Sequence, residues 1–306
     1  MTSPTLAVLG AQTPLGAALV ERWLKTGALH VVPLSRDPAT WVSALRASKA
    51  ETLCVLGDSD QALPVLKSLS PLREAGIARC ILLSSTALYG AKPIHPALLT
   101  EATPLLTMGA SPWTDRHLKL EQLGDALSGT FSVAHLRLAP ILALGLKSPW
   151  SLYFALPFIV RLMGFDPLWQ VLHLDDAARA VAAALASDAN GAFNIVGRGV
   201  SPLSHLIRAA GKVGLPLPPT LAEGALGLTG GQGPVGLRST LLPALRYGCV
   251  ADGRRAEALL GFAPHWHVVD TAANMGSNRD GTRENHEHPT RLAMGLARRA
   301  AAVFRH

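Results

Sequence analysis

The chain has 306 residues, of which 49% are hydrophobic and 16% charged, so it can bury a large core and is too apolar for wholesale disorder. Its net charge is +7, but residues 277–306 hold six arginines against three acidic residues and contribute +3, which leaves +4 spread along the rest without a basic run. This distribution argues against a nucleic-acid-binding surface.

Export and membrane insertion are not expected. The chain opens on an apolar strand pattern rather than on a basic and then apolar leader, which favours a cytoplasmic protein. The most apolar stretch, residues 150–165, is too short to span a bilayer and contains Pro157 and Arg161. The three cysteines are widely spaced and two lie in apolar runs, so we expect reduced thiols.

The first 140 residues alternate short apolar runs with helical segments. We expect strands at 5–9, 30–34, 52–57, 79–85 and 131–142, and helices at 14–25, 40–48, 61–75 and 113–127. Short apolar runs separated by helices are typical of a parallel sheet covered on both faces, in which ligands bind at the carboxyl ends of the strands. Chemistry is therefore expected at the strand ends, which are Gly10, Ser35, Gly57, Ser84, Ser85 and Ala139.

The pattern changes after residue 140. A helix capped by Asp175 or Asp176 is expected to run to about residue 186, followed by a strand at 192–197. The Pro/Gly-rich region 214–236 reads as loop or broken helix, and 278–289 as a polar linker.

The last segment, residues 291–305, is expected to be an amphipathic helix. Arg291, Arg298 and Arg305 recur every seven residues, opposite an apolar face formed by Leu292, Leu296, Ala300, Val303 and Phe304. Such a helix can rest on an anionic membrane surface or on a partner protein, or it can pack on its own domain with its arginines in water. Both alternatives remain open at this point.

Several motifs occur in a characteristic order: GAQTPLG from Gly10, SSTALYG from Ser84, HLDD from His173, GAFNIVG from Gly191 and RYGCVADGRRAEALLGFAP near the end. Together they resemble the extended short-chain dehydrogenase/reductase superfamily, and within it the NAD-dependent epimerase/dehydratase family, over residues 5–275. The resemblance implies an α/β, Rossmann-like doubly wound parallel sheet in residues 1–145, completed by 170–198. It also implies a small substrate subdomain from 146–170 and 199–276, with the tail 277–306 outside the family pattern.

The resemblance implies NADP or NAD as cofactor. The expected contacts in the first loop are Gly10, Gln12, Thr13, Leu15 and Gly16, where Thr13 replaces a glycine that normally lets the backbone approach the pyrophosphate. The second strand lacks a terminal acidic residue and offers Ser35 and Arg36, a pair that favours a 2′-phosphate unless Arg36 is simply an exposed loop residue. Gly57 and Ser84 complete the expected cofactor contacts. The segment between Leu34 and Thr52 is too short to hold the additional strand that family members have there. The adenine pocket is therefore expected to be less enclosed.

The family's chemistry uses a tyrosine, a lysine four residues later and a serine or threonine at a strand end. Ser85 matches the last position, while alignment on Glu121 places Trp113 where the tyrosine belongs and His117 where the lysine belongs. Tryptophan does not ionise, but histidine titrates near neutrality, so Ser85 and His117 are the catalytic candidates. The alternative is that His117 is a buried structural residue. Lys119 is expected to face elsewhere on the helix.

The segment before the HLDD motif, residues 156–172, is dominated by Leu, Phe, Ile, Met and Trp, with Arg161 as its only basic residue. It predicts a small apolar, lipid-like ligand, or merely a pocket filled by its own side chains. No metal is expected at His173, Asp175 and Asp176, which read as the start of a helix. Two hypotheses follow: a reductase- or epimerase-like enzyme that uses NAD(P), and a catalytically silent scaffold of the same fold that docks through its basic tail.

Overall fold

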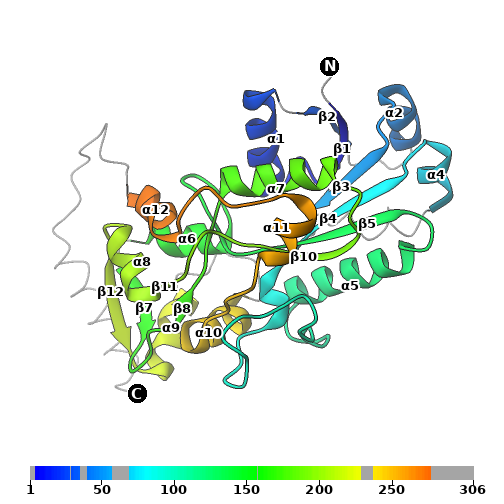
Figure 1. Ribbon diagram of the computed structural model, residues 1–306. Helices are drawn as coiled ribbons and strands as arrows, with labels where there is room; N and C mark the ends of the chain where they lie inside the picture. Colours follow the sequence, from blue (N-terminus) through cyan, green and yellow to red (C-terminus); the bar gives the residue numbers. More distant parts are fainter. Residues whose placement is uncertain are drawn as a thin grey trace.

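The computed structural model describes residues 4–27, 29–34, 40–56, 69–156, 158–228 and 237–276 (Figure 1). At its centre is a parallel six-stranded sheet in the order β10–β5–β4–β3–β1–β2. Its strands are β1 (Thr5–Leu9), β2 (His30–Pro33), β3 (Thr52–Leu56), β4 (Arg79–Ser85), β5 (Ser132–Leu138) and β10 (Gly191–Ile195). The predicted doubly wound parallel sheet is confirmed.

Both faces of the sheet are covered because its strands are apolar at successive positions. In β1, Leu6 and Val8 join one buried cluster, and Ala7 and Leu9 join another. Helices α1 (Pro14–Thr26), α7 (Leu174–Ala186) and α11 (Arg254–Leu260) cover the first face, and α2 (Trp41–Ser48), α4 (Leu69–Glu74) and α5 (Pro112–Leu127) cover the second (Figure 1). The Trp23 indole N–H donates to the Ala178 carbonyl at 3.0 Å and so ties α1 to α7.

A second group of elements packs beyond the carboxyl ends of the strands (Figure 1). It has its own apolar core, which includes Phe154, Trp169, Val171, Leu206 and Leu245. Its helices are α6 (Pro149–Ala155), α8 (Leu203–Ala209), α9 (Pro219–Leu228), α10 (Leu237–Tyr247) and α12 (Val268–Ala273). Its short strand pairs are β7 (Phe158–Leu162) with β12 (Val213–Leu217), β8 (Leu168–Trp169) with β11 (Ser201–Pro202), and β6 (Ile141–Leu142) with β9 (Leu172–His173). The domain limits given above stay a prediction.

Three local predictions are wrong. The single strand expected at 131–142 is two strands, because β6 leaves the sheet and pairs with β9. The Pro/Gly-rich region, expected as loop or broken helix, does contain helix α9, but it also contains strand β12, which pairs in parallel with β7. Helix α7 is capped by His173, whose Nδ1 accepts from the Asp175 N–H at 3.2 Å, and not by either aspartate.

Other expectations concern segments that lie partly or wholly outside the described residues. Between Leu34 and Thr52 the described residues form only α2, so β2 is the edge of the sheet in that part of the structure. The helix expected at 61–75 is described only as α4, and the basic tail lies outside the described residues. Within the described ranges, no helix is both long enough and apolar enough to cross a membrane. Cys54 and Cys80 are buried free thiols.

Candidate functional site

The loop between β1 and α1 is closed by its own residues. Gly10 has a φ of 92°, a left-handed conformation that favours glycine. Thr13 caps α1: its hydroxyl donates to the Gly10 carbonyl at 2.8 Å and accepts from the Gly16 N–H at 3.1 Å. A Cβ on Gly16 would lie 2.0 Å from the Gly10 oxygen. Gly16 is therefore required for close packing of helix on strand, and Thr13 occupies one of the helix's first amides.

A groove of about 730 Å³ with mixed polar and apolar walls opens beside this loop. Gln12, Thr13 and Pro14 line it on one side, and residues 142–147 with His173 line it on the other. Leu15 is half-buried and packs against the apolar core instead. Ser35, Arg36 and Gly57 lie outside the described residues, so their predicted cofactor contacts stay predictions.

The two serines at the end of β4 differ in their surroundings. The Ser85 hydroxyl accepts from the Ala87 N–H at 3.2 Å and caps the short helix η2 (Thr86–Tyr89). The Ser84 hydroxyl is buried and has no hydrogen-bond partner among the described residues. The Ser85 oxygen thus caps the helix while its hydroxyl hydrogen can still donate, and Ser84 also retains a donor at the carboxyl end of the strand.

Tyr89 belongs to a buried polar network rather than to an open site. Its hydroxyl donates to the Asn194 side-chain oxygen at 2.7 Å and accepts from Arg137 at 2.9 Å. Arg137 in turn holds the Glu121 carboxylate with nitrogen–oxygen distances of 3.0 and 2.6 Å. Burial opposes the charge of Arg137, but the hydrogen bonds and charge of Glu121 keep its pKa above the ordinary value. Burial raises the pKa of Tyr89, so its phenol stays protonated as a structural donor.

Trp113 and His117 form a pair on α5. Their ring centroids are 4.0 Å apart, and the His117 Nδ1 lies 2.9 Å from the Trp113 carbonyl oxygen, to which it donates. His117 is buried, and burial lowers its pKa to about 4, so it is neutral near pH 7. Lys119 is exposed on the same helix, as expected.

The low pKa of His117 predicts a pH dependence of stability. An exposed histidine titrates near pH ~6.5, so the unfolded chain binds this proton first. The contribution of neutral His117 to the free energy of unfolding is therefore fully present above that pH. It is lost as the pH falls toward 4, by up to about 3 kcal/mol. Urea unfolding at pH 7 and pH 5 should show a smaller loss in His117→Gln than in the wild type. His135 titrates in the same direction, so part of the loss should remain.

The control is His30→Gln, which changes an exposed histidine on β2. It should keep the wild-type pH dependence. Equal losses in His117→Gln and His30→Gln would contradict a neutral, buried His117.

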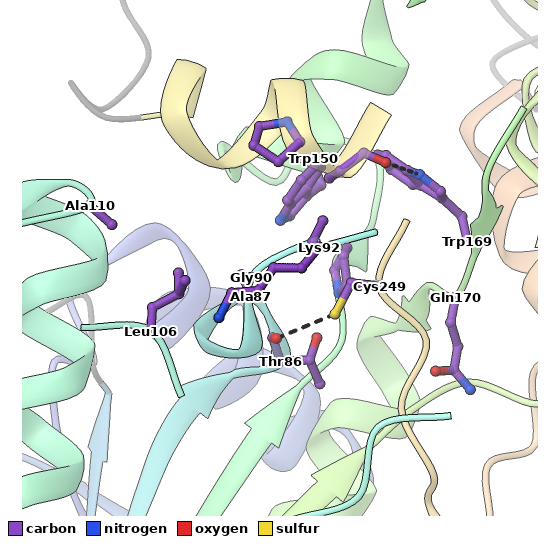
Figure 2. Close-up of a pocket in the computed structure, with 14 residues that line it drawn as sticks. Thr86, Ala87, Gly90, Lys92, Leu106, Ala110, Trp150, Trp169, Gln170 and Cys249 are labelled. Carbon is purple, nitrogen blue, oxygen red and sulfur yellow. Dashed lines mark hydrogen bonds between the residues drawn. The ribbon is translucent and has the colours of Figure 1, made fainter. Parts of the chain in front are cut away.

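An apolar cavity of about 150 Å³ lies just past η2 (Figure 2). Trp150 and Trp169 meet edge to face with centroids 5.2 Å apart, and the Trp169 indole N–H donates to the Ala244 carbonyl at 3.1 Å. The remaining lining residues are Thr86, Ala87, Gly90, Ala91, Lys92, Leu106, Ala110, Pro140, Gln170, Pro243 and Cys249. Neither Ser85 nor His117 lines this cavity.

No protein-family model matches the chain, but solved structures match its fold over most of its length. UDP-glucose 4-epimerase of Thermus thermophilus, in complex with NAD, is 17% identical, with a TM-score of 0.63 over 90% of this chain and 99% of the other. dTDP-glucose 4,6-dehydratase of Bacillus anthracis, also with NAD, is 12% identical, with a TM-score of 0.64 over 90% and 96% of the two chains. A functionally unknown protein of Silicibacter pomeroyi is 20% identical, with a TM-score of 0.61 over 89% and 98%.

The chain has the fold of these NAD-bound epimerases and dehydratases. Among curated proteins it is similar to the uncharacterized proteins Rv0501 of Mycobacterium tuberculosis and Mb0513 of Mycobacterium bovis, each 29% identical over 234 residues. The match covers 74% of this chain and 62% of each relative, so the chain spans less than two thirds of their length.

In this fold, the residues predicted from the sequence fall into two groups. Gln12 and Thr13 line the groove, and Gly10 and Gly16 shape the loop beside it. Ser84 and Ser85 lie at the end of β4. The apolar segment before the HLDD motif contributes Trp169 and Gln170 to the cavity. Trp150 begins the apolar stretch 150–165, which the sequence indicates as a lining segment, whereas sequence reasoning missed the lining residues Pro243, Ala244 and Cys249. Their only signal was apolar character, which they share with the core.

The histidine and aspartates of the HLDD motif have structural partners. The His173 ring stacks on Trp266 with centroids 4.1 Å apart. The Asp176 carboxylate accepts from the backbone N–H groups of His265 and Trp266 at 3.0 and 2.9 Å. Across the described residues, no group of three or more His, Cys, Asp or Glu side chains could hold a metal ion.

Proposed function

We propose that the chain binds a nicotinamide dinucleotide, NADP or NAD, at the β1–α1 loop and a small apolar molecule in the Trp150–Trp169 cavity. The observation that carries this proposal is the placement of the loop and the cavity. Both lie at the carboxyl edge of the parallel sheet, where open α/β sheets bind their ligands (Figures 1 and 2). Several structures of the same fold are complexes with NAD.

The residues present fit a dinucleotide phosphate at the loop. The tight approach of Gly16 to Gly10 brings the start of α1 to the end of β1, and a helix N-terminus favours an anion. The groove beside Gln12 and Thr13 offers room for the rest of the molecule. Thr13 uses the Gly16 amide, which predicts weaker phosphate binding than an all-glycine loop gives. When bound, the nicotinamide would supply a hydride donor or acceptor.

We propose that Trp113 and His117 stand where the family has its tyrosine and lysine. The His117 Nδ1–H donates to the Trp113 carbonyl oxygen, so Nε2 is the ring nitrogen left to accept a proton. A pKa of about 4 makes it a weak base near pH 7. The Ser85 hydroxyl can donate to a substrate oxygen while its oxygen still caps η2, and the Ser84 hydroxyl beside it is also without a hydrogen-bond partner among the described residues.

The burial of His117 favours a second candidate, a catalytically silent binding module. In that case the chain binds its ligands without turnover and docks to a membrane surface or a partner through Arg291, Arg298 and Arg305. If the protein binds both NADPH and an apolar ligand but oxidises no NADPH with a panel of apolar ketones and aldehydes, this candidate is favoured. Steady NADPH oxidation that Ser85→Ala or His117→Gln abolishes would favour the enzyme.

Thermal unfolding with NADH and NADPH tests the cofactor proposal. A cofactor present at about 100 times its Kd should stabilise the protein by about 2.7 kcal/mol. Arg36→Ala should reduce the stabilisation by NADPH and leave that by NADH unchanged. The matched control is Arg46→Ala, which removes an exposed arginine of α2 that pairs with Glu74. If neither cofactor stabilises the protein at millimolar concentration, the dinucleotide site is refuted.

A further inference from the structure

The apolar cavity ends at a single cation. We infer that its ligand is a small carboxylic acid with a ring-sized apolar body, such as an arylalkanoate, whose carboxylate pairs with Lys92. This inference rests on the proposed ligand site and names the chemical class of its occupant.

The size and the lining of the cavity determine what kind of apolar group the ligand can carry. A volume of about 150 Å³ is that of a protein cavity that admits benzene. Trp150 and Trp169, at an interplanar angle of 87°, present one ring edge and one ring face. Aromatic groups pack favourably against such a pair. Alanine, leucine and proline side chains form most of the remaining wall, so the body of the ligand is apolar and compact.

Most polar groups along the cavity are already bound to other protein atoms. The Gln170 side-chain oxygen accepts from the Ala251 N–H at 3.0 Å, and its nitrogen donates to the Gly197 carbonyl at 3.4 Å. The Cys249 thiol donates to the Thr86 carbonyl at 3.5 Å. Burial raises the pKa of this thiol to about 12, so it stays protonated. These groups stabilise the wall and leave little capacity for a polar ligand.

Lys92 is the exception. It is exposed, and the described residues form no ion pair with it. Figure 2 shows its side chain crossing the space between Trp150 and η2, with the amino group on the side of Leu106. None of the 14 lining residues is acidic. A single ammonium beside an apolar cavity matches a ligand with one negative charge, whereas a phosphate would call for more donors.

Isothermal titration calorimetry with two probes of equal shape tests this inference. 3-Phenylpropionate carries a carboxylate, and 3-phenyl-1-propanol carries a neutral hydroxyl on the same body. At low ionic strength the carboxylate should bind about fivefold more tightly, and the preference should shrink as salt is added. Lys92→Met should weaken the carboxylate to the level of the alcohol without changing the affinity for the alcohol. Lys92→Arg should keep the preference.

Ala110→Phe is the control for location, because Ala110 is exposed and lines the cavity, so a larger side chain can block it without disturbing the core. It should abolish binding of both probes while the thermal midpoint stays unchanged. If the wild type binds neither probe, the apolar ligand site itself fails. If it binds both equally, or if Lys92→Met keeps the preference, the ligand site stands and only the carboxylate inference is overturned.

Discussion

Replacing Arg137 with methionine is expected to lower the free energy of unfolding by about 3–5 kcal/mol, because the Glu121 carboxylate would be left buried and without its charge partner. Arg137 also donates to the Tyr89 hydroxyl, so the substitution removes a partner from a second buried group. Urea unfolding followed by circular dichroism measures the loss directly.

Two variants sharpen this test. Arg254→Met removes an exposed arginine side chain, and its largely buried partner Asp252 keeps a hydrogen bond from the Arg254 backbone N–H, so this variant should lose much less stability. The double variant Glu121→Gln, Arg137→Met removes both charges and should recover part of the lost stability. If Arg137→Met is as stable as Arg254→Met, the buried ion pair does not contribute the predicted free energy of unfolding.

Replacing Gly16 with alanine is expected to destabilise the protein by at least about 2 kcal/mol and to abolish dinucleotide binding. The added Cβ would lie 2.0 Å from the Gly10 carbonyl oxygen and 2.9 Å from the Ala11 Cα. Both are backbone atoms, so helix α1 has to move away from the end of β1. The thermal midpoint and NADPH-induced stabilisation should fall together.

Gly224→Ala is the matched control, since Gly224 lies in helix α9 with nothing within 4 Å of an added Cβ. Alanine there should raise stability by about 0.5–1 kcal/mol. If Gly16→Ala changes stability no more adversely than Gly224→Ala, the close packing of α1 on β1 does not require glycine at position 16.

The central sheet could be predicted because short stretches of neighbouring residues indicate each of its strands. Each strand is a short apolar run, and each is separated from the next by a helical pattern or a glycine turn. The β1–α1 loop was equally accessible, because Gly10 and Gly16 reflect backbone requirements at fixed spacing. The buried setting of His117 was only one of two open alternatives, since burial depends on what packs against α5.

The rest depended on contacts between distant segments. β12 contains Gly214 and Pro216, which are poor strand formers, but its parallel pairing with β7, such as Leu215 opposite Val160, outweighs their low propensity. Asp176 was expected to cap α7, but it binds backbone amides 89 and 90 residues away. His173 took over the cap through an imidazole nitrogen, which sequence rules for caps rarely consider. The cavity joins several separate segments, none of which has a distinctive pattern.

The position of β10 has a consequence for how the chain is made. β10 is the partner of β5 at one edge of the central sheet, although some 50 residues of other structure intervene. Helix α7, which packs beside α1 and accepts the Trp23 hydrogen bond, precedes β10 directly. Until residues 174–195 have left the ribosome, the amino-terminal half therefore has one open strand edge and one sheet face that α1 covers only in part. This unit is completed late, and in that interval its apolar face is open to chaperones and to aggregation.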